Sequence, residues 1–162
     1  MKNRTHVIFA ALLYAFMFAA DQDVSVFNIP KEVDRCMDAL RGDYKISGRI
    51  NPFYLRGDFL GDGKSEFAVL VYSSLKQEKG IAFCGPGFAK PTILGAGSPF
   101  HEMTDLTFDA WHIYGKGPVQ RGVGARMPPV LRGEALWLEW SESASGLAYW
   151  DGKQFHWYQQ GD

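Results

Sequence analysis

Residues 67–72 read FAVLVY, an uninterrupted apolar run that is rich in strand-forming residues. A short run of this kind, with turn-forming residues on either side, is typical of a strand whose two faces are both buried. The stretch therefore predicts the central strand of a sheet that is covered on both sides.

Shorter β segments surround this strand along the chain. We expect them at residues 53–59, 81–84, 92–94, 111–114 and 135–140. Gly85-Pro86-Gly87 and Gly95-Ala96-Gly97 are strong turn signals that separate them. A Gly- and Pro-rich stretch at residues 115–133 predicts a long surface loop.

One amphipathic helix precedes the strands. Its apolar residues fall at i, i+3, i+4 and i+7 and form a single stripe: Val33, Cys36, Met37 and Leu40. Pro30 suits the first turn of this helix, and Gly42 suits the position after its end. The predicted fold class is mostly β with one N-terminal helix, built as a curled antiparallel sheet or a small barrel.

Length and composition limit the classes of protein that fit. A chain of 162 residues suffices for one domain, with 46% hydrophobic and 22% charged residues, so a globular fold is expected rather than disorder. Lys and Arg number 17 against 18 Asp and Glu, a net charge of −1. This balance argues against a nucleic-acid-binding protein that depends on bulk positive charge.

Residues 1–20 have the features of a secretory signal peptide. Lys2 and Arg4 precede the uncharged run VIFAALLYAFMFAA at residues 7–20, and Asp21 follows. The run is too short for a comfortable membrane span, which needs about 20 apolar residues. We expect cleavage after Ala20, a single β-rich domain at residues 21–162 and a periplasmic or secreted location, with an uncleaved N-terminal anchor as the alternative.

The mature chain would keep both cysteines of the sequence, Cys36 and Cys84. Two cysteines in one small exported domain are usually oxidised to each other. A disulfide is therefore expected, and two buried free thiols are the alternative. Without residues 1–20 the chain would carry 15 basic and 18 acidic residues, so the exported domain is acidic.

Asp151-Gly152 lies between two aromatic runs and predicts a β-hairpin with a two-residue turn. In that register Trp150 is opposite Lys153. The period of two places Trp and Phe side chains on the core face. The other face would expose a polar set to solvent and to a partner, namely Ser145, Tyr149, Tyr158 and Gln160.

The segment Gly57-Asp58-Phe59-Leu60-Gly61-Asp62-Gly63-Lys64-Ser65-Glu66 resembles the calcium loops of FG-GAP and VCBS extracellular repeats. Asp58, Asp62 and Glu66 stand at positions 1, 5 and 9 of such a loop, and oxygen ligands at alternate positions suit calcium. Leu60 replaces the usual oxygen ligand at position 3. The resemblance implies a structural calcium ion, and the alternative is a glycine-stabilised β-turn with solvated acids.

The segment Ser143-Ala144-Ser145-Gly146-Leu147-Ala148-Tyr149 is similar to the S-G-x-x-Y signature of periplasmic inhibitors of C-type lysozymes. In that family the motif serine and a later lysine reach the catalytic carboxylates of lysozyme. Ser145 matches the serine and Tyr149 the tyrosine, whereas Gln160 stands where the lysine would be. The resemblance implies an inhibitor or immunity-type partner of a cell-wall hydrolase; a bend at the start of a strand, with packed aromatics, is the alternative.

The sequence gives little support to an enzyme. His101, His112 and His156 are widely spaced, and neither a zinc-protease pair nor a G-x-S-x-G elbow occurs. We therefore expect a non-enzymatic binding protein. A second hypothesis is direct binding of glycan or peptidoglycan, because exposed Trp side chains can stack on sugar rings. Trp137 is the best candidate for that role, since its neighbours Leu136 and Leu138 belong to the other face of the strand.

Overall fold

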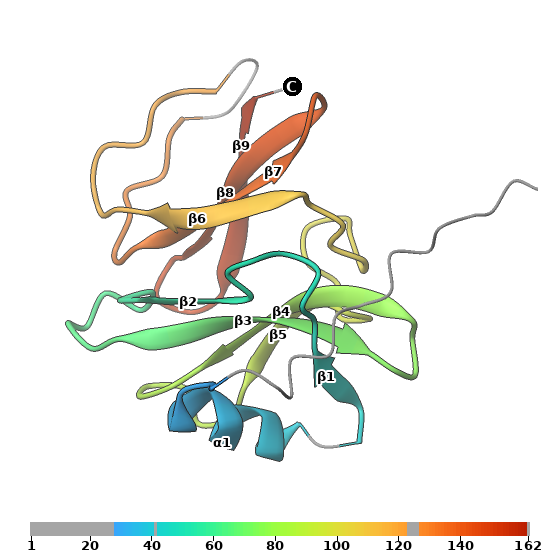
Figure 1. Cartoon of the computed structure of the whole chain (residues 1–162). Helices are drawn as coiled ribbons and strands as arrows, with labels where there is room; N and C mark the ends of the chain where they lie inside the picture. Colours follow the sequence, from blue (N-terminus) through green and yellow to red (C-terminus); the bar gives the residue numbers. More distant parts are fainter. Residues whose placement is uncertain (1–27, 41, 123–126, 162) are drawn as a thin grey trace, which may run out of the picture.

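The computed structural model describes residues 28–40, 42–122 and 127–161. The two β-sheets lie one above the other, and the helix lies on the outer side of the lower sheet (Figure 1). The predicted signal peptide, residues 1–20, falls outside the described residues. Within those residues no helix is long and apolar enough to cross a membrane.

Helix α1 (Lys31–Ala39) forms where the apolar stripe predicts it. Pro30 occupies the N-cap, one position before the first turn, and Gly42 has a φ of 92° just beyond the helix end. Val33 and Cys36 are its buried residues, and they face the lower sheet. Cys36 and Cys84 form a disulfide with their Cα atoms 5.8 Å apart, which confirms the predicted pair.

The lower sheet consists of β1 (Tyr44–Ile46), β2 (Tyr54–Gly57), β3 (Glu66–Ser73), β4 (Glu78–Cys84) and β5 (Thr92–Gly95). All of its pairings are antiparallel. On one side of β3, β2 pairs with the first half of the strand and β1 with its last three residues. On the other side, the whole of β4 pairs with β3. The FAVLVY stretch is therefore the central strand, as predicted.

The upper sheet is a meander of β6 (Ala110–Tyr114), β7 (Ala135–Trp140), β8 (Ala144–Trp150) and β9 (Phe155–Gly161), each antiparallel to the next. Between β6 and β7 the structure describes residues 115–122 and 127–134, which contain no strand or helix, in agreement with the loop predicted at residues 115–133. This loop returns across the outer face of the sheet, where Val119 and Leu131 pack with Leu147 and Tyr158.

The main core lies between the two sheets. Its largest fully buried side chains include Phe59, Phe83, Phe108, Leu106 and Leu136. On the opposite face of β3, Val69 and Val71 pack with residues of α1. The alternating residues of one strand therefore enter two different cores, which explains why FAVLVY carries no polar residue.

The mostly β class with one helix is confirmed for the described chain. The two sheets are not closed into a barrel, because β6 and β9 remain separate edges of the upper sheet. The connection at residues 96–109 carries the chain from one sheet to the other without continuing the strand ladder. The arrangement is a two-sheet sandwich with a helix on one outer face.

Candidate functional site

The C-terminal hairpin has a wider turn than the sequence predicts. Trp150 pairs with Phe155, so residues 151–154 form the turn and the predicted pairing of Trp150 with Lys153 is wrong. The Asp151 carboxylate explains the extra length, because its Oδ1 accepts the backbone N–H groups of Lys153 and Gln154 at 2.7 and 2.8 Å. These bonds lower the pKa of Asp151 to about 2, with a contribution from His156.

From Gly146 to Trp150 the pairing is shifted by two residues along β9, and a shift of two leaves these side chains on their predicted faces. Ala148, Phe155 and Trp157 contribute to the core between the sheets, as expected. Tyr149 and Tyr158 lie on the outer face with Leu147.

The outer face is nevertheless not the open surface that we expected. Tyr158 is only 7% exposed, because Val119 and Leu131 of the long loop pack over it, and its hydroxyl oxygen lies 3.4 Å from the Gly122 backbone nitrogen. Gln160 is half-buried and donates a hydrogen bond to the Gln120 carbonyl at 3.1 Å. The expectation that Tyr158 faces solvent is therefore wrong, because Val119 and Leu131, which are distant from Tyr158 in the sequence, pack against it.

Tyr149 lies at the other end of β8 from Ser145. Its ring contacts His156, which pairs with the Asp151 carboxylate at 2.8 Å. Burial, and then the charge of Asp151, raise the pKa of the Tyr149 phenol. The four residues proposed for partner binding are thus divided among an exposed sheet end, a covered patch and a hairpin turn.

Ser145 is the one of the four that lines an open depression. It pairs with Glu139 on β7 and Gly161 on β9, at a β-bulge between Ser145 and Gly146. The depression has a volume of about 370 Å³ and lies at the β7–β8 turn. We call it the acidic hollow, and it is lined by Trp137, Glu139, Trp140, Glu142, Ser143, Ala144, Ser145 and Gly161.

Acceptor groups dominate the acidic hollow. The side chains of Glu139, Glu142, Ser143 and Ser145 make no hydrogen bond or ion pair within the described chain. Glu142 holds a φ of 60° in the turn, a left-handed conformation that few non-glycine residues adopt. Two carboxylates and two hydroxyls are therefore free to meet a ligand.

Two aromatic residues complete the hollow. The Trp140 indole N–H donates to the Thr107 hydroxyl at 3.3 Å, and the Trp140 ring packs edge-on against Trp157. Trp137 is half-buried, and its ring lies nearly parallel to those of His112 and Tyr114. These contacts hold the walls of the hollow in place before any ligand arrives.

Sequence reasoning missed the acidic members of this site. Glu139 lies near the end of β7 and Glu142 in the turn that follows it, so both precede the S-G-x-x-Y segment, which begins at Ser143. The alternation of Trp137 and Glu139 on one face of β7 was the available signal.

The acidic loop before β3 uses its carboxylates to fix its own backbone. Asp58 accepts the N–H groups of Gly61, Asp62 and Gly63 at 2.8 to 3.1 Å. Asp62 accepts the Lys64 N–H and pairs with the Lys64 ammonium group at 3.3 Å, which lowers its pKa.

Glu66 is fully buried, and its Oε2 accepts the Phe59 N–H at 3.0 Å. Its other oxygen, Oε1, has no hydrogen-bond partner. Burial raises the pKa of Glu66, and the charges of Asp62 and Asp58 add to this shift. Among the residues that the structure describes, no three His, Cys, Asp or Glu side chains are arranged to hold a metal ion. The three acids thus do not form a ligand set in this arrangement, and calcium binding stays a prediction from the sequence.

The same loop connects the two sheets. The Asp58 N–H donates to the Glu134 carboxylate at 2.8 Å, and the Glu134 N–H donates to the Asp58 carbonyl at 2.7 Å. Gly61 and Gly133 lie so close that a side chain at either position would meet backbone atoms of the other segment at 2.8 Å or less. The loop therefore has a structural role at the start of β7.

Protein-family models, curated proteins and solved structures give no match to this chain.

Proposed function

We propose that the chain is an exported binding protein that acts without catalytic turnover and docks a positively charged protein surface. A basic cell-wall hydrolase is the partner that we favour. The observation that carries this proposal is the acidic hollow, which collects two unpaired carboxylates, two free hydroxyls and an indole around Ser145.

The chemistry of the hollow favours a ligand that supplies hydrogen-bond donors. Carboxylates form their strongest hydrogen bonds with guanidinium and ammonium groups. Trp137 would add a cation–π contact to such a group if its ring face meets it. The excess of acids over bases in the predicted mature chain would also steer a basic partner toward this protein.

The position of Glu142 favours one of two ways in which this protein could inhibit a cell-wall hydrolase. Glycosidase clefts contain two carboxyl groups, of which at least one is ionised. A turn that carries Glu142 would be repelled by that charge. The Gln160 amide donates to the Gln120 carbonyl and does not line the hollow with Ser145. Docking on the basic rim of a hydrolase, with the cleft blocked by the body of the protein, fits the charges better than insertion of Ser145 between the catalytic acids.

Titration calorimetry and inhibition assays against C-type, G-type and I-type lysozymes test this proposal. We expect stoichiometric binding of at least one class, weakened about tenfold by the pair Glu139→Gln and Glu142→Gln. Glu102→Gln is the matched control, because Glu102 is exposed and does not line the acidic hollow. Undiminished binding by the double variant would remove the hollow from the contact, and the absence of any binding would remove the hydrolase as partner.

Glycan or peptidoglycan binding is the second candidate, favoured by Trp137 in the wall of the hollow. Sugar hydroxyls could donate to Glu139 and Ser145 while a ring stacks on the indole. Sedimentation with purified peptidoglycan distinguishes this candidate, since contacts to sugar hydroxyls and ring faces are less sensitive to salt than charge pairs are. Retention in high salt that is lost in Trp137→Ala would favour glycan over a basic protein.

Two further parts of the proposal have separate tests. Export is supported by residues 1–20 and by the disulfide, and mass spectrometry of the protein recovered from the producing cell should find an N-terminus at Asp21.

A structural calcium ion at Asp58, Asp62 and Glu66 requires a chelator-sensitive melting temperature, and Asp62→Ala should abolish that sensitivity. Equal melting with and without chelator would remove calcium.

A further inference from the structure

A second depression lies on the α1 side of the molecule, away from the acidic hollow. It consists of two adjoining hollows of about 440 and 510 Å³ that share Glu32 and Pro86. One extends along α1 past the disulfide to Lys90, and the other extends to Tyr54 and Arg56 on β2. We call the two together the α1 groove.

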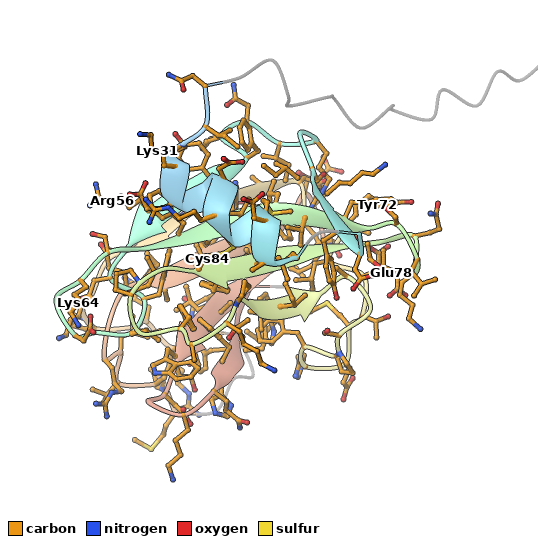
Figure 2. All side chains as sticks on the ribbon, turned by 90° about the horizontal axis from the view of Figure 1, so that it is seen from below. Lys31, Arg56, Lys64, Tyr72, Glu78 and Cys84 are labelled. Carbon is orange, nitrogen blue, oxygen red and sulfur yellow. A yellow bond between two sulfur atoms is a disulfide. The ribbon has the colours of Figure 1, made fainter. Side chains whose placement is uncertain are left out.

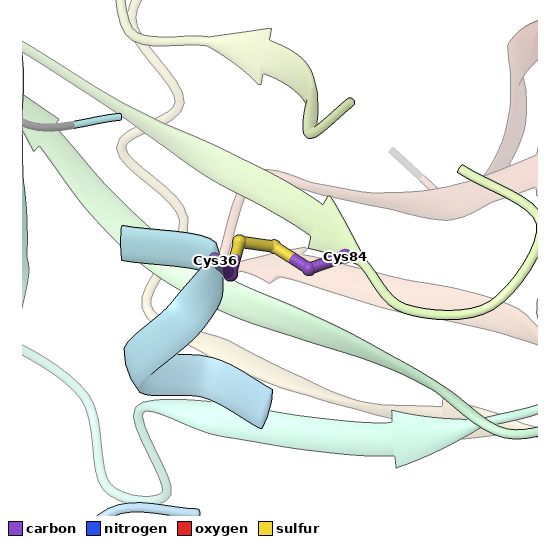
Figure 3. The surroundings of a disulfide bond; sticks show 2 residues. All are labelled: Cys36 and Cys84. Carbon is purple, nitrogen blue, oxygen red and sulfur yellow. A yellow bond between two sulfur atoms is a disulfide. The ribbon is translucent and has the colours of Figure 1, made fainter. Parts of the chain in front are cut away.

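The walls of the α1 groove are held rigidly. One wall is α1 and the other is the segment that follows β4, and the Cys36–Cys84 disulfide joins them (Figure 3). Gly85 holds a φ of 135° at the end of β4, where an added Cβ would lie only 3.0 Å from the Glu66 Cα. The groove is therefore formed before a ligand binds, which lowers the entropy cost of binding.

The charge of the α1 groove is opposite to that of the chain. Arg35, Arg56 and Lys90 line it, and none of them makes an ion pair or hydrogen bond within the described residues. Lys31 lies at the same end of the helix as Arg56, as the view onto α1 shows (Figure 2). Glu32 is the single acid in the lining, so the groove carries a positive surplus on an acidic protein.

Apolar side chains lie among these cations in the lining. The Tyr54 and Phe67 rings pack 6.1 Å apart in the lining, and the Arg56 guanidinium group lies 5.9 Å from the centre of the Phe67 ring. Phe88 and Pro86 supply apolar surface beside the disulfide. A ligand would thus meet carboxylate-binding and apolar positions in the same groove.

We propose that the α1 groove binds an extended peptide segment of a partner protein that carries both acidic and apolar side chains. The carboxylates pair with Arg35, Arg56 and Lys90, and the apolar side chains pack on Tyr54, Phe67 and Phe88. Glu32 lies where the two hollows meet and disfavours a continuous polyanion, whereas it accepts the N–H groups that a peptide backbone offers. This binding surface is additional to the acidic hollow and has the opposite charge preference.

The test is a ¹⁵N chemical-shift titration of the oxidised protein with the peptide Ac-Asp-Leu-Asp-Leu-Asp-NH₂. We expect saturable shifts in α1, residues 54–56 and residues 85–91. The pair Arg35→Gln and Arg56→Gln should weaken binding at least about tenfold, because two charge-assisted contacts are lost. Lys153→Gln is the control, since Lys153 is exposed in the hairpin turn and lines neither site.

Three results would overturn the proposal. They are the absence of shifts in the groove at millimolar peptide, equal binding of the Asn-substituted peptide, and tighter binding of polyphosphate at the same residues. Far-UV circular dichroism of each variant separates loss of binding from loss of folding. Because the acidic hollow is not involved, failure here leaves the proposed hydrolase contact standing, and failure of that contact leaves this titration unchanged.

Discussion

Removal of the Cys36–Cys84 disulfide should cost a large part of the stability of this domain. The bridge closes a loop whose ends are 48 residues apart in the sequence. In the chain-entropy model a loop of this length stabilises the folded state by about 4 kcal/mol at 25 °C. For a domain of this size, that loss corresponds to a decrease in melting temperature on the order of 15 °C.

The assay is thermal and urea unfolding of the oxidised protein, of the reduced protein and of the double variant Cys36→Ala, Cys84→Ala. Both cysteines are buried, so the double variant also loses some packing. Comparison of the oxidised with the reduced wild-type chain isolates the effect of the bridge. A decrease of less than about 1 kcal/mol on reduction, with an unchanged m-value, would refute the claim that the bridge restrains the unfolded chain.

Three further changes have expected outcomes with different physical causes. Gly146→Ala should destabilise the domain by about 1–3 kcal/mol in urea unfolding, because its Cβ would lie 2.3 Å from the Trp157 ring. A change below about 0.5 kcal/mol would mean that the ring moves freely. Since the pKa of Asp151 is lowered to about 2, ionised Asp151 stabilises the fold fully above its ordinary pKa, and this stabilisation is lost as the pH falls toward 2. Asp151→Asn should therefore reduce the dependence of the unfolding free energy on pH in this acid range. An unchanged dependence would contradict the assignment. Glu66 should affect stability in the opposite direction, because burial raises its pKa: its ionisation should lower the free energy of unfolding as the pH rises above 4.5. Glu66→Gln should remove that decline. Identical pH profiles of the variant and the wild-type protein would disprove this.

The sequence predicted the elements whose signals are local. The apolar stripe from Val33 located α1, and FAVLVY located the central strand, because both patterns follow directly from the period of the structure. The short strand β1 (Tyr44–Ile46) was missed, since it has only three residues and depends on pairing with Ser73, Tyr72 and Val71.

The candidate site depended on contacts that a local pattern does not contain. The faces of Leu147, Ala148, Phe155, Trp157 and Tyr158 were predicted correctly, because alternation determines them. The exposure of Tyr158 was wrong, because a loop that begins more than 35 residues earlier covers it. The Asp151 carboxylate likewise widened the turn through bonds to Lys153 and Gln154, which a dipeptide turn signal does not encode.

The most direct measurement of the central claim is a ¹⁵N chemical-shift map of this protein during titration with a basic lysozyme of each class. The account predicts shifts centred on residues 139–145 and on Gly161, and their loss at high salt. A map with no shifts at stoichiometric partner, or one centred on a surface remote from Glu139 and Ser145, would contradict it.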